Sequence, residues 1–167
     1  MILIERLDDS HIELIKKINV AEEQEKFACT AEEFLSDFAD TTHRNVIKNN
    51  NLVVGFFKLD TAYSLNYDFC SQNGLGLRTF VIGINYQGQG IGTSAVKALF
   101  PYLKENYPGF DSIYLTVNCK NPSAQSCYRN GGFEDTGEKY LGGAAGPQHI
   151  MCGKIAKQTT MAPISDN

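Results

Sequence analysis

Apolar and polar residues in the first third of the chain change from the period of a strand to that of a helix. Residues 2–7 predict a short strand, and the polar residues 8–10 that follow supply helix-capping side chains. The apolar residues that recur next at helical spacing are Ile12, Leu14, Ile15 and Ile18. A second helix is predicted where Thr30 and Glu33 have the spacing of a capping box. Its apolar face would be Phe34, Leu35 and Phe38.

The middle of the chain has the pattern of antiparallel strands joined by tight turns. Residues 49–51 are three asparagines and predict a turn, after which residues 52–59 predict a strand. A further strand is predicted over residues 61–69, before a turn at residues 71–74. Strands joined by short turns pair in antiparallel fashion, so this part of the chain predicts a hairpin-linked sheet.

The second half of the chain alternates strands with helices. Residues 77–84 are strongly apolar and rich in β-branched side chains, which predicts a strand in the middle of a sheet. A helix begins at Ile91, and Pro101 within it is expected to kink or shorten it because proline lacks a backbone donor. The other predicted elements are a strand at 112–117, a helix at 122–130, and strands at 133–140 and 148–155 around a glycine-rich turn at 142–146.

Composition limits the class of protein. The chain has 167 residues, of which 43% are hydrophobic and 20% are charged, so we expect one globular core, assigned to residues 1–155. Residues 156–167 are polar without periodicity, and we expect a disordered tail. The longest apolar runs are well short of the roughly 18 residues that a membrane span needs, so neither an anchor nor a signal peptide is expected.

The net charge of −4 is too acidic for a domain that mainly binds nucleic-acid phosphates, and no nucleic-acid partner is expected. The distribution of charge is uneven. Residues 1–72 have thirteen acidic and seven basic side chains, whereas residues 73–167 have six acidic and eight basic ones. The back of the chain could therefore hold an anion and the front a cation.

Cysteine and histidine usage gives little sign of metal or disulfide chemistry. The five cysteines are an odd number without a C-x-x-C pair, which favours a reducing cytoplasm over a disulfide framework or a zinc site. The three histidines are scattered, so no metal is predicted. Cys127 or Cys119 with His149 could form a nucleophile and base, but an isolated cysteine is more often a small buried apolar residue.

A glycine-rich turn at residues 85–92 joins the apolar strand to the helix that begins at Ile91. Glycines let the backbone approach a ligand closely, and the first turn of a helix offers unpaired N–H groups to an anion, so the segment predicts a phosphate cradle. It lacks the Gly-Lys-Ser/Thr triplet of a P-loop, and it has Thr93 where a dinucleotide fingerprint needs glycine. ATP, GTP and NAD are therefore disfavoured, and a glycine-rich turn without a ligand stays as the alternative.

A short helix with sharp ends is predicted further along the chain. Asn121 is a good N-cap and Pro122 suits the first helical position, while Gly131 or Gly132 can end the helix. Ala124 and Tyr128 lie four residues apart and so share one face. The small residue would leave room for a ligand beside the phenol. The alternative for the tyrosine is a core aromatic with its hydroxyl at the surface.

These two segments together resemble the acyl-CoA motifs of the GCN5-related N-acetyltransferase (GNAT) family. The first is Gln87-x-x-Gly90-x-Gly92 after an apolar strand, and the second is Asn121-x-x-Ala124-x-x-x-Tyr128-x-x-x-Gly132-Phe133. The match is good over residues 77–155, and the front third shares only the family's order of elements. The resemblance implies one α/β domain with a mixed, mostly antiparallel twisted sheet flanked by helices, in which a splayed central strand pair holds acetyl-CoA.

The resemblance also assigns roles to residues. The pyrophosphate of coenzyme A would bind the amides of Gln87, Gly88, Gln89, Gly90, Ile91, Gly92 and Thr93. The pantetheine arm would lie along Phe80, Val81 and Ile82, pairing with the main chain of the first and last of these. Asn121 would hydrogen-bond that arm beside Ala124, and Tyr128 would protonate the departing thiolate.

The acceptor is expected to be a primary amine that attacks acetyl-CoA directly in a ternary complex. Many relatives have a glutamate on the strand before the phosphate turn, but here that strand offers no acid, so the base stays open. Acids in segments that border the acceptor pocket in this family are Glu22, Glu23, Glu25 and Asp68. A small cationic amine such as a polyamine suits the acidic front half, with Glu22 and Glu25 as its partners. The alternatives are a protein N-terminus or lysine as acceptor, and a non-catalytic acyl-CoA-binding module, while a homodimer is one of the assemblies left open.

Overall fold

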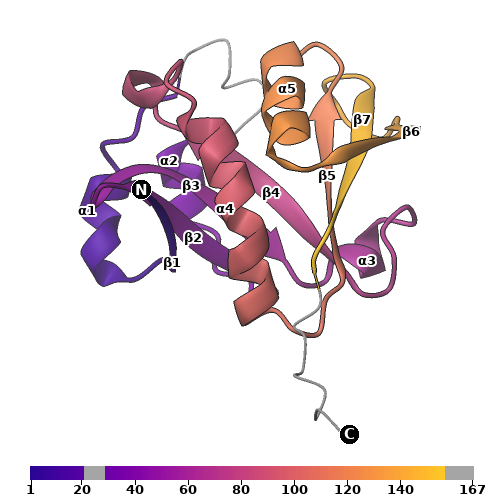
Figure 1. Ribbon diagram of the computed structural model, residues 1–167, viewed down its shortest axis with the longest axis horizontal. Coiled ribbons are helices and arrows are strands. Elements are labelled where there is room, and N and C mark those ends of the chain that lie inside the picture. Colours follow the sequence, from indigo (N-terminus) through magenta and orange to yellow (C-terminus); the bar gives the residue numbers. More distant parts are fainter. Residues whose placement is uncertain (21–28, 157–167) are drawn as a thin grey trace, which may run out of the picture.

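The computed structural model describes residues 1–20 and 29–156 of the chain. Within these residues it has one seven-stranded sheet with helices on both faces (Figure 1). The strands are β1 (Ile2–Arg6), β2 (Thr42–Asn49), β3 (Leu52–Asp60), β4 (Gly74–Ile82), β5 (Ser112–Asn118), β6 (Glu134–Tyr140) and β7 (Gln148–Lys154). The helices are η1 (Asp9–His11), α1 (Ile12–Ile15), α2 (Ala31–Leu35), α3 (Tyr63–Asn66), η2 (Ile84–Tyr86), α4 (Ile91–Asn106) and α5 (Pro122–Gly131).

The strand order is β1-β2-β3-β4-β5-β7-β6, and β4 with β5 is the parallel pair in an otherwise antiparallel sheet. These two strands pair only where Gly74, Leu75 and Gly76 lie opposite Ser112, Ile113 and Tyr114. Beyond that point they diverge. The structure thereby confirms the mixed, mostly antiparallel sheet and its splayed central pair.

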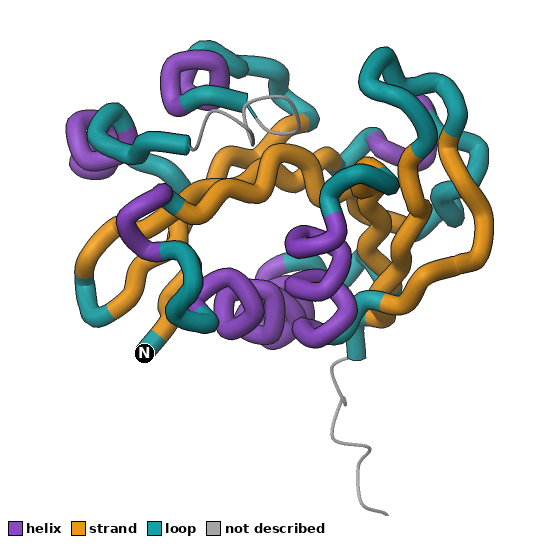
Figure 2. The backbone as a smooth tube through the Cα atoms, turned by 90° about the horizontal axis from the view of Figure 1, so that it is seen from above, coloured by secondary structure: helices purple, strands orange, loops and turns teal. Residues whose placement is uncertain are grey.

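Two apolar clusters, one on each face of the sheet, follow from the alternation of side chains along the strands. Phe57 and Ile47 point into the larger cluster, which α4 covers, whereas their neighbours Phe56 and Val46 point into the cluster covered by α1 and α2. Figure 2 shows these helices on opposite sides of the strands. The sheet is thus buried on both faces over β2, β3 and β4.

Helix α4 continues five residues past Pro101 and ends at Asn106, so of the two expected effects, a kink or a shorter helix, the proline does not end the helix. Leu99 and Leu103 on either side of the proline are fully buried in the larger cluster. Burying two such side chains contributes about 3–6 kcal/mol, enough to offset the roughly 3 kcal/mol cost of an internal proline. No helix in the described residues has the length and apolar character that crossing a membrane would require.

Both predicted helix starts in the front third are present, but the helices are shorter than the apolar spacing indicated. Asp8 caps η1, and Thr30 caps α2 through the reciprocal bonds of a capping box with Glu33. α2 ends at Leu35, so Phe38 lies outside it, exposed, with the Arg44 guanidinium 4.8 Å from the centre of its ring.

The strand predicted over residues 61–69 is wrong, and β2 was not predicted. The Asp60 carboxylate accepts a hydrogen bond from the Ala62 N–H at 2.9 Å, which turns the chain into α3 instead of a further strand. The predicted tail is residues 156–167, of which all but the first lie outside the described residues.

The closed end of the splayed pair depends on a glycine, because the ring of Tyr63 packs directly on Gly76. A Cβ at this position would overlap that ring, so Gly76→Ala should lower the free energy of unfolding by about 1–3 kcal/mol. Gly109→Ala, where a Cβ meets no atom within 4 Å, is the control. Urea unfolding of both variants is the measurement, and equal stability of the two would contradict this packing.

Candidate functional site

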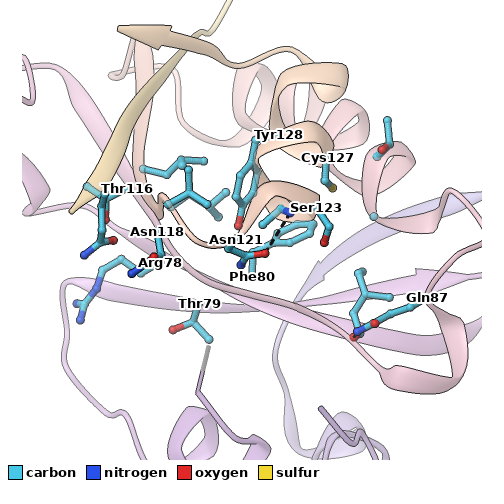
Figure 3. Close-up of a pocket in the computed structure, with 18 of the residues that line it drawn as sticks. Arg78, Thr79, Phe80, Gln87, Thr116, Asn118, Asn121, Ser123, Cys127 and Tyr128 are labelled. Carbon is cyan, nitrogen blue, oxygen red and sulfur yellow. Dashed lines mark hydrogen bonds between the residues drawn. The ribbon is translucent and has the colours of Figure 1, made fainter. Parts of the chain in front are cut away.

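A cleft of about 570 Å³ opens where β4 and β5 diverge. Its walls come from β4, the turn before α4, β5, α5 and α3 (Figure 3). Leu77 and Phe80 belong to the α4 side of the sheet, while Thr79 lies near Cys29 on the α2 side. The lining of the cleft therefore includes residues from both sides of the sheet.

One end of the cleft is the start of α4, where Gly88 and Gly90 have φ angles of 76° and 77°. This left-handed backbone favours glycine, and a Cβ at either position would meet no atom within 4 Å. Open space beside the N-terminus of a 16-residue helix suits a bound anion. These observations fit the predicted phosphate cradle.

The structure brings most, but not all, of the predicted cradle residues to the cleft. Those that line it are Gln87, Gly88, Gly90, Gly92 and Thr93. Ile91 is buried in the larger apolar cluster, and the Gln89 side chain donates to the Asn85 carbonyl at 3.4 Å. Neither lines the cleft, so only their main chains could face a ligand.

The β4 wall is shaped by a bulge at Thr79, a non-glycine residue with a φ of 54°. Phe80 lies opposite Phe57 and Arg78 opposite Lys58, which leaves Thr79 without a partner on β3. Phe80 lines the cleft as predicted, as does Ile82.

The glycine-rich turn before α4 is hydrogen-bonded to the β4 wall, because the Gln87 side chain donates to the Ile82 carbonyl at 2.9 Å. The Val81 side chain instead packs in the apolar cluster on the α1 and α2 face. Val81 can thus face the cleft only through its main chain.

The opposite wall is α5, which begins as predicted with the Asn121 side chain accepting from the Ala124 N–H at 3.3 Å. Tyr128 lies one turn beyond Ala124, and its ring centre is 5.8 Å from that of Phe80 across the cleft. Burial, and to a smaller extent the neighbouring Cys127, raises the pKa of the Tyr128 phenol above its ordinary value of 10. The phenol therefore stays protonated at neutral pH and can act as a donor.

Cys127 also lines the cleft, beside Gly92. Burial raises the pKa of its thiol, which disfavours the nucleophilic thiolate. His149 lies on β7 next to Asp135, at 3.3 Å, and does not line the cleft. The geometry therefore does not support a cysteine–histidine pair. No group of three or more metal-binding side chains occurs in the part of the chain that the structure describes.

Several cleft residues were not singled out from the sequence. Tyr63, the first residue of α3, stacks with Tyr67 just after this helix, with ring centres 4.4 Å apart, and the Tyr63 side chain lies beside Thr116 of β5. Arg78 of β4 also lines the cleft and is held by Asp60 at 3.4 Å. A cation within an otherwise apolar strand was a sequence signal for Arg78, whereas nothing in the sequence indicated that α3 would face β5.

The described lining of the cleft contains no aspartate, glutamate or histidine. Asp68 is exposed on the loop after α3 and does not line the cleft. The other acids considered for the acceptor side, Glu22, Glu23 and Glu25, lie outside the described residues. The proton-bearing side-chain oxygens of the described lining are therefore the phenols of Tyr63, Tyr67 and Tyr128 and the hydroxyls of Thr79, Thr93, Thr116 and Ser123.

Comparison with known proteins identifies the architecture. A family model described as the acetyltransferase (GNAT) family matches residues 9–133. The structure of AAC(6')-Ib in complex with paromomycin and acetyl-CoA superposes with a TM-score of 0.74 and 18% sequence identity, covering 99% of both chains.

Two other solved structures have the same fold. The ribosomal-protein-S18-alanine N-acetyltransferase from Escherichia coli matches with a TM-score of 0.64 and 19% identity, covering 95% of this chain and 98% of that one. The spermidine N-acetyltransferase from Vibrio cholerae, in complex with CoA and spermine, gives 0.61 and 16%, covering 93% and 96%.

Proposed function

Because this chain belongs to the GNAT acetyltransferase family, whose co-substrate is acetyl-CoA, we propose that its cleft catalyses direct acetyl transfer to a primary amine in a ternary complex. The observation that carries the proposal is that Tyr128 lies between the two ends of the cleft (Figure 3), one of which is a helix N-terminus suited to an anion. Such a cleft can hold a long acyl carrier by its phosphates and leave its thioester beside a phenol.

The residues fit coenzyme A in the order that its parts require. The glycines at positions 88 and 90 leave room for the pyrophosphate, and the divergence of β4 from β5 leaves room for an extended arm beside Phe80 and Ile82. Asn121 and Ala124 lie at the start of α5 and line the cleft, as does Tyr128 further along the same helix. Bound acetyl-CoA would supply the activated acetyl group.

In the proposed reaction, Tyr128 donates its proton to the sulfur as the carbon–sulfur bond breaks and the carbon–nitrogen bond forms. A free thiol has a pKa of about 8.5 and a free phenol about 10. Burial in the same apolar surroundings raises both values, so it preserves their rough match. The acceptor loses one proton to water to become a free amine before it attacks, and the proton that its nitrogen releases as the amide forms restores the Tyr128 hydroxyl, since the described lining of the cleft has no carboxylate or imidazole to accept either proton.

This absence leads to a prediction about pH. With no carboxylate or imidazole in the described lining of the cleft, log kcat/KM should rise with a slope near one until the pH reaches the pKa of the acceptor, about 10.4 for a lysine-like amine. Tyr128 must stay protonated, and its raised pKa should place any loss of activity above pH 10. Profiles with amines of different basicity are the measurement. A break at one acidic or neutral pH, shared by all acceptors, would instead indicate a base on the enzyme.

The acceptor expected from the charge distribution is a small cationic amine such as a polyamine. Its support is the excess of acids in residues 1–72, but Glu22 and Glu25 lie outside the described residues and the described lining has no carboxylate. An acetylated protein N-terminus or lysine is the alternative. Solved structures with this fold include enzymes named for spermidine and for a ribosomal-protein alanine, at 16% and 19% identity.

The experiment that tests the proposed function is a screen for release of CoA from acetyl-CoA with amines of several classes. The panel should contain polyamines, amino sugars, amino acids and peptides with free N-termini, and mass spectrometry should confirm the acetylated product. Turnover with any amine supports acetyl transfer. Tight binding of acetyl-CoA without turnover in any class would favour the non-catalytic acyl-CoA-binding module.

A further inference from the structure

Arg78 is the one permanently charged side chain among the described residues that line the cleft. It lies on β4, one residue before the bulge at Thr79, and its side chain is 46% exposed. Figure 3 shows Arg78 and Gln87 toward opposite ends of the cleft, with Tyr128 between them. The charge thus lies away from the phosphate cradle, on the far side of the proposed acid.

The surroundings of Arg78 hold its charge toward the cleft. Its guanidinium is 3.4 Å from a carboxylate oxygen of Asp60, a side chain that is only 6% exposed. The other oxygen of Asp60 accepts the Ala62 N–H. Both oxygens of this acid are therefore engaged, and Arg78 lines the cleft whereas Asp60 does not.

Most N–H donors of the Arg78 guanidinium have no hydrogen-bond partner among the described residues. An arginine side chain carries five N–H donors, and within the described residues Arg78 makes one hydrogen bond, to Asp60. The nearby cation Lys58 is only 9% exposed and has its own partner, Asp37, at 2.9 Å, so it does not share this role. The remaining N–H groups of Arg78 have no hydrogen-bond partner among the described residues and could meet a ligand in the cleft.

We propose that Arg78 selects acceptor amines that carry an anionic group, a carboxylate or a phosphate, near the reacting nitrogen. The inference rests on the proposed acetyl transfer and specifies its acceptor. The planar fork of arginine matches both anions with two parallel hydrogen bonds. A polycation would instead bring a second positive charge toward Arg78, with no carboxylate in the described lining to compensate it.

The test uses pairs of acceptors that differ only in the anion. An amino acid is compared with its amide, and an aminoalkyl phosphate with the corresponding amino alcohol, while a polyamine is the cationic reference. The amine of an amino-acid amide is less basic than that of the free acid and so is more often unprotonated. A preference for the acid cannot therefore arise from amine basicity. A charge-assisted contact of this kind should raise kcat/KM by about 10- to 100-fold.

Substitution of Arg78 tests whether the preference for anionic acceptors comes from this residue. Arg78→Gln should raise KM for the anionic acceptors and leave kcat/KM for their neutral partners nearly unchanged. Because this variant leaves Asp60 buried without its cation, the double variant Arg78→Gln with Asp60→Asn removes both members of the pair. Arg129→Gln is the matched control, since Arg129 is exposed on α5 and does not line the cleft.

Binding measured without turnover separates this inference from the proposed function. Calorimetry of the protein saturated with CoA, titrated with each acid and its neutral partner, should show tighter binding of the acid and loss of that difference in Arg78→Gln. Retained binding without turnover would then contradict acetyl transfer but not this selectivity. Preference in the carboxylate pair, the phosphate pair or both supports the inference and identifies the anion. Equal binding in both pairs, a preference for the polyamine, or an acid preference that persists in both Arg78 variants would overturn it.

Discussion

Tyr128→Phe is expected to lower kcat by roughly 10²–10⁴-fold while acetyl-CoA still binds. The substitution keeps the ring and its contacts with Phe80 and Phe133, at 5.8 Å each between ring centres, and removes only the hydroxyl. The departing thiolate would then lack the donor that neutralises it. Steady-state kinetics, together with calorimetric titration of acetyl-CoA, would measure the two quantities separately.

Tyr86→Phe is the control for this result, because Tyr86 packs against both apolar clusters and does not line the cleft. It should keep its turnover. Wild-type kcat in Tyr128→Phe would assign Tyr128 a packing role only. A fall in kcat together with lost acetyl-CoA binding would indicate that the hydroxyl holds the co-substrate rather than the leaving group.

Gly90→Val should weaken acetyl-CoA binding by about 10²-fold, the equivalent of one or two charge-assisted hydrogen bonds. The new side chain would occupy the open space at the start of α4 where the pyrophosphate is proposed to lie. Its φ of 77° also strains a β-branched residue, so some loss of stability accompanies the substitution.

A second glycine separates these two effects. Gly137 on β6 has a φ of 84° and the same open surroundings, but it does not line the cleft. Gly137→Val should therefore lose comparable stability and bind acetyl-CoA normally. If both variants fold and bind acetyl-CoA equally well, the phosphate cradle lies elsewhere.

Sequence reasoning predicted the elements whose sides differ clearly in polarity and missed those whose polar groups turn inward. β2 was missed because it carries Asn45 into the interior, where that side chain accepts from the Tyr102 hydroxyl of α4 at 2.6 Å. The oxygen of this amide is satisfied by a helix distant in sequence, while its nitrogen donates to the His43 carbonyl at 3.1 Å. The false strand at 61–69 had the opposite cause, since its aromatic residues favour strands but pack on one another around α3.

The candidate site was likewise predicted only in part from the sequence. The glycine-rich turn and the Asn121 to Tyr128 helix could be found because each is a local motif with its own backbone requirements. Arg78 reaches its position through a bulge that changes the alternation of β4 at Thr79. A bulge depends on the partner strand, so a single sequence did not indicate which side of β4 would carry the cation.

The short contact between β4 and β5 has a consequence for how the protein folds. β2 with β3 and β6 with β7 pair close neighbours along the chain, whereas the three residue pairs that join β4 to β5 bring Gly74 next to Ser112 across the whole of α4. Contacts between distant residues form slowly because a long loop must close first, so we expect the two parts of the sheet to assemble late. A ligand that bridges them binds only the assembled state, and at a hundred times its Kd it would add about 2.7 kcal/mol to stability. The concentration of acetyl-CoA would then influence the fraction of this protein that is folded, in addition to its catalytic rate.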